Sequence, residues 1–387
     1  MEEYVISLRR ELHENAECGY DLPKTLAILK RELDAIGVEY TEAYGKSSIV
    51  ATVNPEKSHF TIGVRADIDA LPILEKTGAP YASKNEGMMH ACGHDAHAAM
   101  AMAALKEIYA MRDQISCRVK FLFQASEEAG PSGAMLMTKD GVMEDIDCII
   151  ATHVGTGSNA GTVALLAGPN TASSDGYVVD FFGKAAHVAN QEKGIDAIMM
   201  AVKAYNAIEL MIAKEVAAKE PVIFNVGSIH GGDTNNIICP QCTMYFSLRT
   251  WREETRKMLL DKIERICRFT AELAGGECRL EEKKAYPIVN NNEILHDLVY
   301  ASAVKVFGEE NICTKPRGMG GEDFAYFANE KPGYMFRLGV RNEEKGIVHT
   351  AHTDKFDIEE SGLKYGVALF VQFILDNMDG IPALKQL

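Results

Sequence analysis

The sequence predicts an α/β protein in which a smaller α+β domain interrupts a larger domain. A chain of 387 residues is long for a single hydrophobic core, which favours two domains. In the first half, strand-like runs end in side chains that bind metals, as expected at the edge of an α/β sheet. The middle of the chain instead follows the order strand, helix, strand, strand, helix, strand, the split βαβ pattern of ferredoxin-like domains. The predicted boundaries are 1–173 and 289–387 for the two parts of the larger domain and 174–288 for the insertion.

Composition narrows the class of protein. The net charge of −15 disfavours nucleic acids and anionic membranes as partners, because both require a positive face. No apolar run approaches the ~20 residues of a membrane span, and the acidic start lacks the pattern of a signal peptide. Nine scattered cysteines do not resemble a secreted disulfide framework. We therefore predict a cytoplasmic protein that binds neither nucleic acid nor membrane. Because the protein is acidic, an anionic substrate would need a positively charged side chain at the binding site.

The elements of the first segment follow from periodicity and capping. Apolar residues recur at helical spacing in residues 2–18 and predict a helix. Pro23 suits the first turn of a second helix, which Gly37 ends. Short apolar runs are typical of buried strands, and a run of small residues predicts one buried helix. The strands are expected at 48–53, 60–65, 118–124 and 146–151, and that helix at 98–111.

The insertion and the last segment are assigned in the same way. Polar and apolar residues alternate over Thr243–Thr250, which predicts a half-buried strand. A long helical pattern follows and stops at Gly275-Gly276. The expected elements of the insertion are strands at 177–183, 222–229, 243–250 and 278–284 and helices at about 194–217 and 253–274. In the last segment we expect helices at about 293–307 and 359–378 and a strand at 334–339.

The stretch Met89–His97 holds three histidines, one cysteine and one aspartate, separated by small residues. Imidazole, thiolate and carboxylate together are the ligand set of a borderline metal such as zinc. For a single histidine, a satisfied side chain at a helix start is the ordinary alternative. Five ligand-type residues in nine positions favour a metal site, for which the rest of the chain must supply further ligands and a base.

Three strand-like runs end in suitable groups, namely Asp67 and Asp69, Glu127 and Glu128, and His153. Strand ends of one sheet lie on a common edge, so these groups can meet. Adjacent glutamates diverge, so that one can bind a metal while its neighbour acts on an activated water. Near the end of the chain, His352 and His349 are both candidates for the last ligand, and position alone does not separate them.

The candidate ligands are too many for one tetrahedral zinc that keeps an open position. They suit two metals ~3.5–4 Å apart, the arrangement of many hydrolases. Thiolate and imidazole favour Zn²⁺, whereas carboxylate-containing dinuclear sites also take Mn²⁺, Co²⁺ or Ni²⁺. The candidate ligands are Cys92, His94, Glu128, His153 and His352, with Glu127 as the base.

Five motifs in family order give the chain its resemblance to the M20 family of metal-dependent peptidases and amidohydrolases. They are Arg9–His13, Arg65–Pro72, Met89–Asp95, Glu127-Glu128 and Gly321–Phe324. The similar branch contains hippurate hydrolases, auxin-conjugate hydrolases, N-acyl-amino-acid amidohydrolases and N-acetyldiaminopimelate deacetylase. The resemblance implies a metallo-exopeptidase-like catalytic domain with a mixed central sheet. It also implies that the insertion is a lid and dimerisation domain.

Carried over residue by residue, the resemblance implies the same five metal ligands and Glu127 as the general base. His352 is preferred to His349 because Phe356–Ile358 follows at the distance found in the family. The resemblance also implies a homodimer in which a lid histidine reaches the active site of the partner subunit and stabilises the oxyanion. This histidine is His187, and the positions implicated in substrate binding are Asn236 and Arg249.

The expected reaction is hydrolysis of the amide bond of N-acyl amino acids, for example N-acetyl or aromatic acyl derivatives. One alternative is a dipeptidase or aminopeptidase of the same superfamily, whose pocket would have to accept a free ammonium group. Another is a non-catalytic binding protein, but this would predict loss of the base or a ligand, and all are present. The chain departs from the family pattern around the pocket and lid, which concerns the substrate rather than the reaction. The departures are at Ala16-Glu17, Val154–Gly157, Ala185-Ala186, Gln191-Glu192 and Asp196-Ala197.

Overall fold

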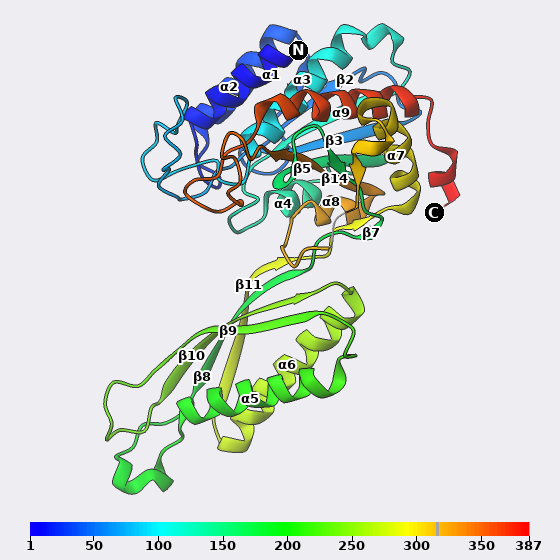
Figure 1. Cartoon of the computed structure of the whole chain (residues 1–387). Helices are drawn as coiled ribbons and strands as arrows, with labels where there is room; N and C mark the ends of the chain where they lie inside the picture. The colour runs from blue at the N-terminus through cyan, green and yellow to red at the C-terminus, as the bar shows by residue number, and fades with distance from the viewer. Residues whose placement is uncertain (315–316, 387) are drawn as a thin grey trace. The chain divides into compact units, whose positions relative to one another are not determined.

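The computed structural model describes residues 1–314 and 317–386 (Figure 1). The chain divides into two compact units. The first unit takes the two ends of the chain, and the second takes Thr171–Ile288 together with Arg317–Glu322. Within the described ranges, no helix is both long and apolar enough to cross a bilayer.

The first unit is built on a mixed eight-stranded sheet in the order β1-β2-β4-β3-β5-β14-β6-β13. The strands at its centre, β4, β3, β5 and β14, run parallel to one another, while β1 and β2 add antiparallel pairs at one side. Parallel strands place their carboxyl ends on one edge, where α/β proteins bind ligands. The bounds are Glu39–Thr41 (β1), Ile49–Val53 (β2), Thr61–Asp67 (β3), Arg118–Gln124 (β4), Cys148–Asn159 (β5), Val163–Ala164 (β6), Ile312–Cys313 (β13) and Gly333–Arg341 (β14).

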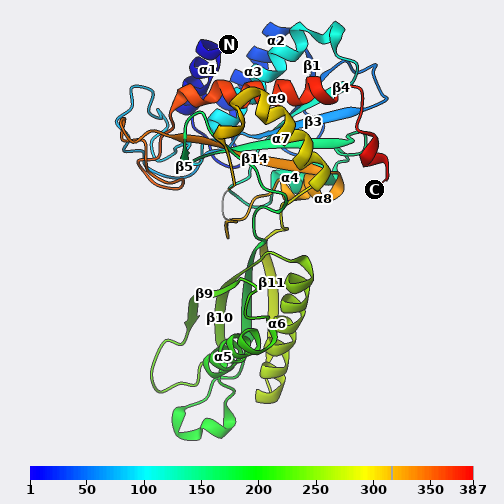
Figure 2. The ribbon, with the colours of Figure 1, turned by 45° about the vertical axis from the view of Figure 1, so that its right-hand side comes forward.

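Helices cover both faces of this sheet, because alternate strand residues point to opposite sides. Ile62, Val64 and the other strand residues that point to the same side pack in one core with α1, α2, α3, α7 and α9. Leu122 and Ile149 belong to a second, smaller core with α4 and α8. Figure 2 shows α1, α3 and α9 on one side of the sheet and α4 and α8 on the other. The helices are Glu2–Glu14 (α1), Pro23–Ile36 (α2), His94–Ala110 (α3), Gly133–Lys139 (α4), Glu293–Phe307 (α7), Ala325–Glu330 (α8) and Leu363–Asn377 (α9).

Two elements differ from the sequence prediction where they carry candidate ligands. Helix α3 begins at His94 rather than at residue 98, because Gly93 adopts a left-handed conformation (φ 86°) as its N-cap. A Cβ atom at this position would lie 2.3 Å from Val154, so both the backbone and the packing require glycine. Strand β5 continues to Asn159, because pairing with β14 extends beyond the apolar run. His153 therefore lies within a strand rather than after one.

The second unit has the element order β8-α5-β9-β10-α6-β11. Its four strands form an antiparallel sheet in the order β11-β8-β10-β9. Helices α5 and α6 pack on one face through Met200, Ile208, Leu259 and Ile263, and both lie on the same side of the sheet in Figure 1. The bounds are Ser174–Phe182 (β8), Ala197–Glu215 (α5), Val222–Gly231 (β9), Gln241–Thr250 (β10), Glu253–Ala274 (α6) and Glu277–Tyr286 (β11).

Candidate metal centre

Six of the predicted site residues converge in the first unit. Their donor atoms form two overlapping groups. Within each group, all donor atoms lie within 4.8 Å of one another. The A group consists of Cys92, His94 and His153, and the B group of Cys92, Glu128 and His352. Glu127 forms a further group of this kind with His94 and Glu128. Cys92 belongs to both the A and the B group, so its sulfur is the donor that the two groups share.

Individual distances connect the two groups into one cluster. Cys92 Sγ lies 3.5 Å from His153 Nε2. Glu128 Oε1 lies 3.1 Å from His352 Nε2 and 3.9 Å from His94 Nε2. These donors come from the segment that leads into α3, the loop after β4, the middle of β5 and the loop after β14. The candidate ligands therefore reach the common edge of the sheet from four separate segments.

Backbone carbonyls orient the two histidines of the A group. His94 Nδ1 is 2.8 Å from the carbonyl oxygen of Asp69, and His153 Nδ1 is 2.7 Å from that of Val154. A carbonyl only accepts, so both Nδ1 atoms carry a hydrogen, and Nε2 is the ring nitrogen that each histidine presents to a metal, as in metal-binding histidines. The buried Nε2 atom of His94 makes no hydrogen bond to the described residues. A divalent metal ion would satisfy this nitrogen.

The chemistry of Cys92 also fits a metal. Burial raises the pKa of its thiol, and the nearby Glu127 and Glu128 carboxylates act in the same direction. A bound divalent ion reverses this balance, because it stabilises the thiolate.

The geometry separates His352 from His349, which the sequence alone did not. His352 has a left-handed backbone (φ 66°), and its N–H donates to the carbonyl of Ala91 at 2.8 Å. This conformation, uncommon for residues other than glycine, brings its ring to Glu128. His349 belongs to neither group and presents only its carbonyl oxygen, which accepts from Thr156 Oγ1 at 3.0 Å.

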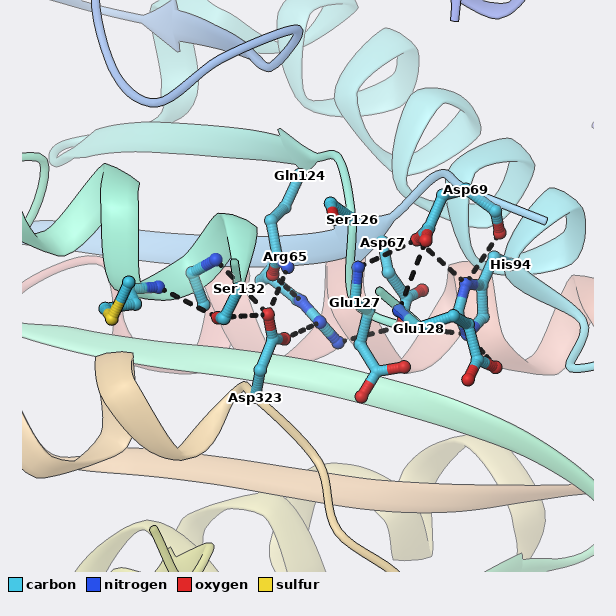
Figure 3. A network of polar contacts seen from close by, with 12 residues as sticks. Arg65, Asp67, Asp69, His94, Gln124, Ser126, Glu127, Glu128, Ser132 and Asp323 are labelled. Atoms are coloured by element: carbon cyan, nitrogen blue, oxygen red, sulfur yellow. Dashed lines mark hydrogen bonds and ion pairs between the residues drawn. The ribbon is translucent and has the colours of Figure 1, made fainter. Parts of the chain in front are cut away.

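Asp69 orients the pair of adjacent glutamates (Figure 3). Its two carboxylate oxygens accept from the backbone N–H groups of Glu127 and Glu128 at 3.0 and 3.2 Å. The preceding residue, Ser126, has a left-handed backbone (φ 56°), which turns the chain sharply after β4. Glu127 is buried and Glu128 is half-buried. One aspartate thus supports the candidate base, one candidate ligand and, through its own carbonyl, His94.

The other three predicted residues lie in the second unit, at two ends of its sheet. His187 forms a bridge with Ile237, and Val188 N donates to the carbonyl of Asn236 at 3.0 Å, so His187 and Asn236 are neighbours. Both are exposed. Arg249 lies at the opposite end of β10, where its guanidinium donates to the carbonyl of Met319 at 3.0 Å. The structure therefore brings two of these three residues together.

A buried ion network around Arg9 was not predicted as part of the site. The guanidinium of this residue is fully buried and contacts Asp95 at 2.7 Å, Asp357 at 3.2 Å and Glu360 at 3.2 Å. It links α1 to the residue after His94 and to the segment after His352. The available signal was positional, since Arg9 and His13 share the buried stripe of α1 with Val5 and Leu12. A charged residue in an apolar stripe indicates a buried partner.

Replacing Glu75 by glutamine is expected to lower the free energy of unfolding by about 2 kcal/mol at pH 7. Burial raises the pKa of this carboxyl, but bonds from His13, Ser83 and Thr77 outweigh burial and lower the pKa to about 2. A depressed pKa stabilises the fold above the unfolded value, near 4.3, and this contribution disappears as the pH falls towards 2. Urea unfolding of both proteins from pH 7 to pH 3 measures the effect. A difference in stability that does not change with pH would contradict it.

A mixed α/β sheet that presents a cluster of this kind defines the class of dinuclear metallohydrolases. Comparison with known proteins identifies the family. The model of the peptidase family M20/M25/M40 matches residues 63–376, and the chain belongs to this family. It is a metal-dependent amidohydrolase, with the mixed catalytic sheet and inserted α+β domain that its motifs predicted.

Three curated relatives show the range of named activities. Thermostable carboxypeptidase 2 of Saccharolobus solfataricus is 32% identical over 95% of this chain and 93% of its own. N-acetyl-L-cysteine deacetylase of Bacillus subtilis is 32% identical over 94% of this chain and 85% of its own. Hippurate hydrolase of Campylobacter jejuni is 32% identical over 89% of each chain.

Among solved structures, a dinuclear metal-binding peptidase of the M20 family from Bacillus subtilis is similar to this chain. The two share 25% identity, with a TM-score of 0.82 over 98% of this chain and 99% of the other. The resemblance to the M20 family is thereby confirmed. The family and the candidate ligand clusters support divalent metal ions in this protein.

Proposed function

We propose that this protein hydrolyses the amide bond of N-acyl amino acids and releases a carboxylic acid and a free amino acid. The observation that carries the proposal is the pair of donor groups that share Cys92, with the buried carboxylate of Glu127 beside them. The relatives named for hippurate hydrolysis and N-acetylcysteine deacetylation support this substrate class. We propose Zn²⁺ or Mn²⁺ as the two metals, and Co²⁺ or Ni²⁺ as substitutes.

The proposed mechanism assigns one task to each residue. Two divalent ions held by the A and B groups would polarise the scissile carbonyl and lower the pKa of water. Glu127 accepts a proton from the attacking water and returns it to the departing amino nitrogen. Asp69 holds the backbone of Glu127 in place throughout, through the 3.0 Å hydrogen bond to its N–H. Addition of one water to the amide thus yields the acid and the amine.

The second unit is proposed as a lid and dimerisation domain that completes the site. Arg249 would bind the substrate carboxylate, while His187 would stabilise the oxyanion and Asn236 would bind substrate. His187 lies beyond the Gln241 end of β10, whereas Arg249 lies near the other end of this strand. The eight residues from Gln241 to Arg249 correspond to about 27 Å of extended strand. One small substrate does not span that distance. We therefore propose that Arg249 comes from one subunit and His187 from its partner.

Strand β9 supports the proposed homodimer. It ends the sheet of the second unit, so one side of its backbone faces outward. Ile223 and Ile229 on this strand are exposed, at 42% and 37% of their surface. An edge strand with exposed apolar side chains suits pairing with a second copy of the chain.

A carboxypeptidase activity is the second candidate, because two relatives carry that name, each over 95% of this chain. An N-acyl amino acid and the C-terminal residue of a peptide offer the same scissile amide and the same carboxylate. They differ only on the acyl side. A turnover screen of N-acetyl amino acids, N-benzoyl amino acids, N-blocked dipeptides and free dipeptides, with the metal varied, distinguishes the candidates. Cleavage of free dipeptides alone would overturn the proposal.

Mixing two inactive variants should restore activity if the active site is shared between subunits. Glu127→Gln removes the base, and His187→Ala is expected to lower kcat about 10²–10³-fold. After subunit exchange at equal amounts, about half the dimers are mixed and each holds one intact site, so about one quarter of the wild-type activity should return. Activity against mixing time measures this. As a control, Glu127→Gln mixed with the double variant should stay inactive, and a lack of recovery in the first mixture would contradict the shared site.

A further inference from the structure

Behind the A group lies a second buried histidine, His97, on α3 one turn after His94. Its Nε2 atom accepts the backbone N–H of Val154 at 2.9 Å. A backbone N–H only donates, so this nitrogen is unprotonated and the hydrogen resides on Nδ1. Nδ1 donates it to Asp67 Oδ1 at 2.6 Å. Both ring nitrogens are therefore occupied, and His97 has no lone pair left for a metal, although it belongs to the same histidine-rich stretch as His94.

Val154 connects His97 to a candidate ligand. Its N–H is held by His97, and its carbonyl accepts the Nδ1–H of His153 at 2.7 Å. The two imidazoles also pack edge to face, with ring centroids 4.8 Å apart. The register between β3 and β5 runs as far as Arg65 and Ala151, so the N–H of Val154 lies beyond this ladder. The ring of His97 takes the place of a neighbouring strand as the acceptor for this N–H. The same ring thereby fixes the backbone that orients the adjacent candidate ligand, His153.

Asp67 holds His97 in this state. It is completely buried and receives Arg65 Nη1 at 3.0 Å, while Nη2 of the same guanidinium contacts Asp323 at 2.8 Å (Figure 3). The Nδ1–H of His97 donates to one carboxylate oxygen, and Arg65 donates to the other. This carboxylate accepts the hydrogen of His97 on Nδ1, so the acceptor nitrogen Nε2 faces Val154.

The B group is supported differently. The backbone N–H of Glu128 donates to Asp69, and the N–H of His352 donates to Ala91. Neither of these contacts involves His97. Loss of His97 should therefore disturb the orientation of His153 and leave Glu128 and His352 in place.

We propose that His97 is a positioning residue for the A group, acting through the backbone of Val154 on the ring of His153, and that it controls the affinity of one metal ion of the pair. The inference rests on the proposed dinuclear site. Removal of a group that orients a ligand commonly lowers metal affinity about 10–100-fold. The distinctive expectation is that replacement of His97 lowers the affinity for only one of the two metal ions.

Two amide variants separate the two hydrogen bonds of His97. Glutamine places an oxygen near the position of Nε2 and can still accept from Val154, whereas asparagine reaches only Asp67. His97→Asn is expected to weaken one Zn²⁺ about 10–100-fold and to leave the other within about threefold of the wild type, and His97→Gln should restore most of the loss. Zinc titration against competing chelators, with metal analysis after dialysis, measures both affinities. His296→Gln, which removes a histidine bonded to Tyr334 at 2.8 Å elsewhere in the first unit, serves as the control.

Wild-type titration comes first, because a wild type that binds fewer than two ions would count against the proposed dinuclear function itself. The positioning role is overturned if His97→Asn retains both affinities, or if it weakens both ions equally. It is also overturned if only the melting temperature of the metal-free protein falls, since a purely structural role predicts that result. Should His97→Asn fail to fold, His97→Met, which fills the space without an acceptor, provides the same comparison with His97→Gln.

Discussion

Replacing Glu127 by glutamine is expected to leave two metal ions bound and to lower kcat by about 10³-fold or more. Glutamine keeps the size of the side chain and the backbone bond to Asp69, which is 3.0 Å long, but it does not accept a proton. The loss should appear in kcat, with little change in KM, because the residue acts on the attacking water rather than on the bound substrate. Steady-state kinetics and metal analysis of the same preparation measure both quantities.

The adjacent residue provides a matched control for this experiment. Glu128→Gln changes the same group one position further along, but Glu128 belongs to the B group of donors. We expect this variant to lose activity through loss of metal, so that excess metal partly restores it. Excess metal should not restore Glu127→Gln. A Glu127→Gln enzyme that turns over at the wild-type rate would refute the assignment of the base.

Replacing Cys92 by serine is expected to lower the affinity for both metal ions by at least about 100-fold. This loss exceeds the one expected for substitution of a residue that only supports a ligand. Cys92 is the one donor common to the A and B groups, so its loss affects both ions together. The contrast with His97→Asn, for which only one ion is expected to bind more weakly, is the test. Zinc titrations of the two variants measure the difference, and retention of either ion at wild-type affinity in Cys92→Ser would contradict the assignment of Cys92 to both groups.

Alkylation offers a second measurement on the wild-type protein. Bound metal should protect Cys92 from iodoacetamide, because a coordinated sulfur is unavailable to the reagent. The partly exposed Cys313 lies outside both groups and serves as an internal control. Peptide mapping by mass spectrometry reads both cysteines from one sample. Equal rates at Cys92 with and without metal would argue that it is not a ligand.

Much of the fold was predictable, because the decisive signals are local. The helices at 293–307 and 253–274 have the predicted bounds, since each combines an apolar stripe with a clear stop. Strand ends were less predictable. β5 continues through Gly155 and Gly157, whose lack of side chains removes the apolar pattern, while pairing with β14 maintains the strand. Such pairing joins residues that are far apart in sequence and leaves no local trace.

The candidate ligands were predictable because their types and spacing are unusual, whereas their supports were not. The sequence alone does not show that both ring nitrogens of His97 are hydrogen-bonded, to Asp67 and Val154, while Nε2 of His94 makes no hydrogen bond to the described residues. These partners lie 30 and 57 positions from His97 in the chain. The roles of His187, Asn236 and Arg249 came from family resemblance and remain predictions.

The order of the ligands along the chain has a consequence for biosynthesis. Cys92, His94 and His153 all leave the ribosome before the inserted unit is made, whereas His352 follows about 200 residues later. At ~5–20 residues per second this interval lasts about 10–40 s. The A group is thus complete long before the B group, and metal capture during translation is expected to be sequential. We expect a nascent chain to acquire one ion before the other, and hydrolytic competence to follow only after His352 has emerged.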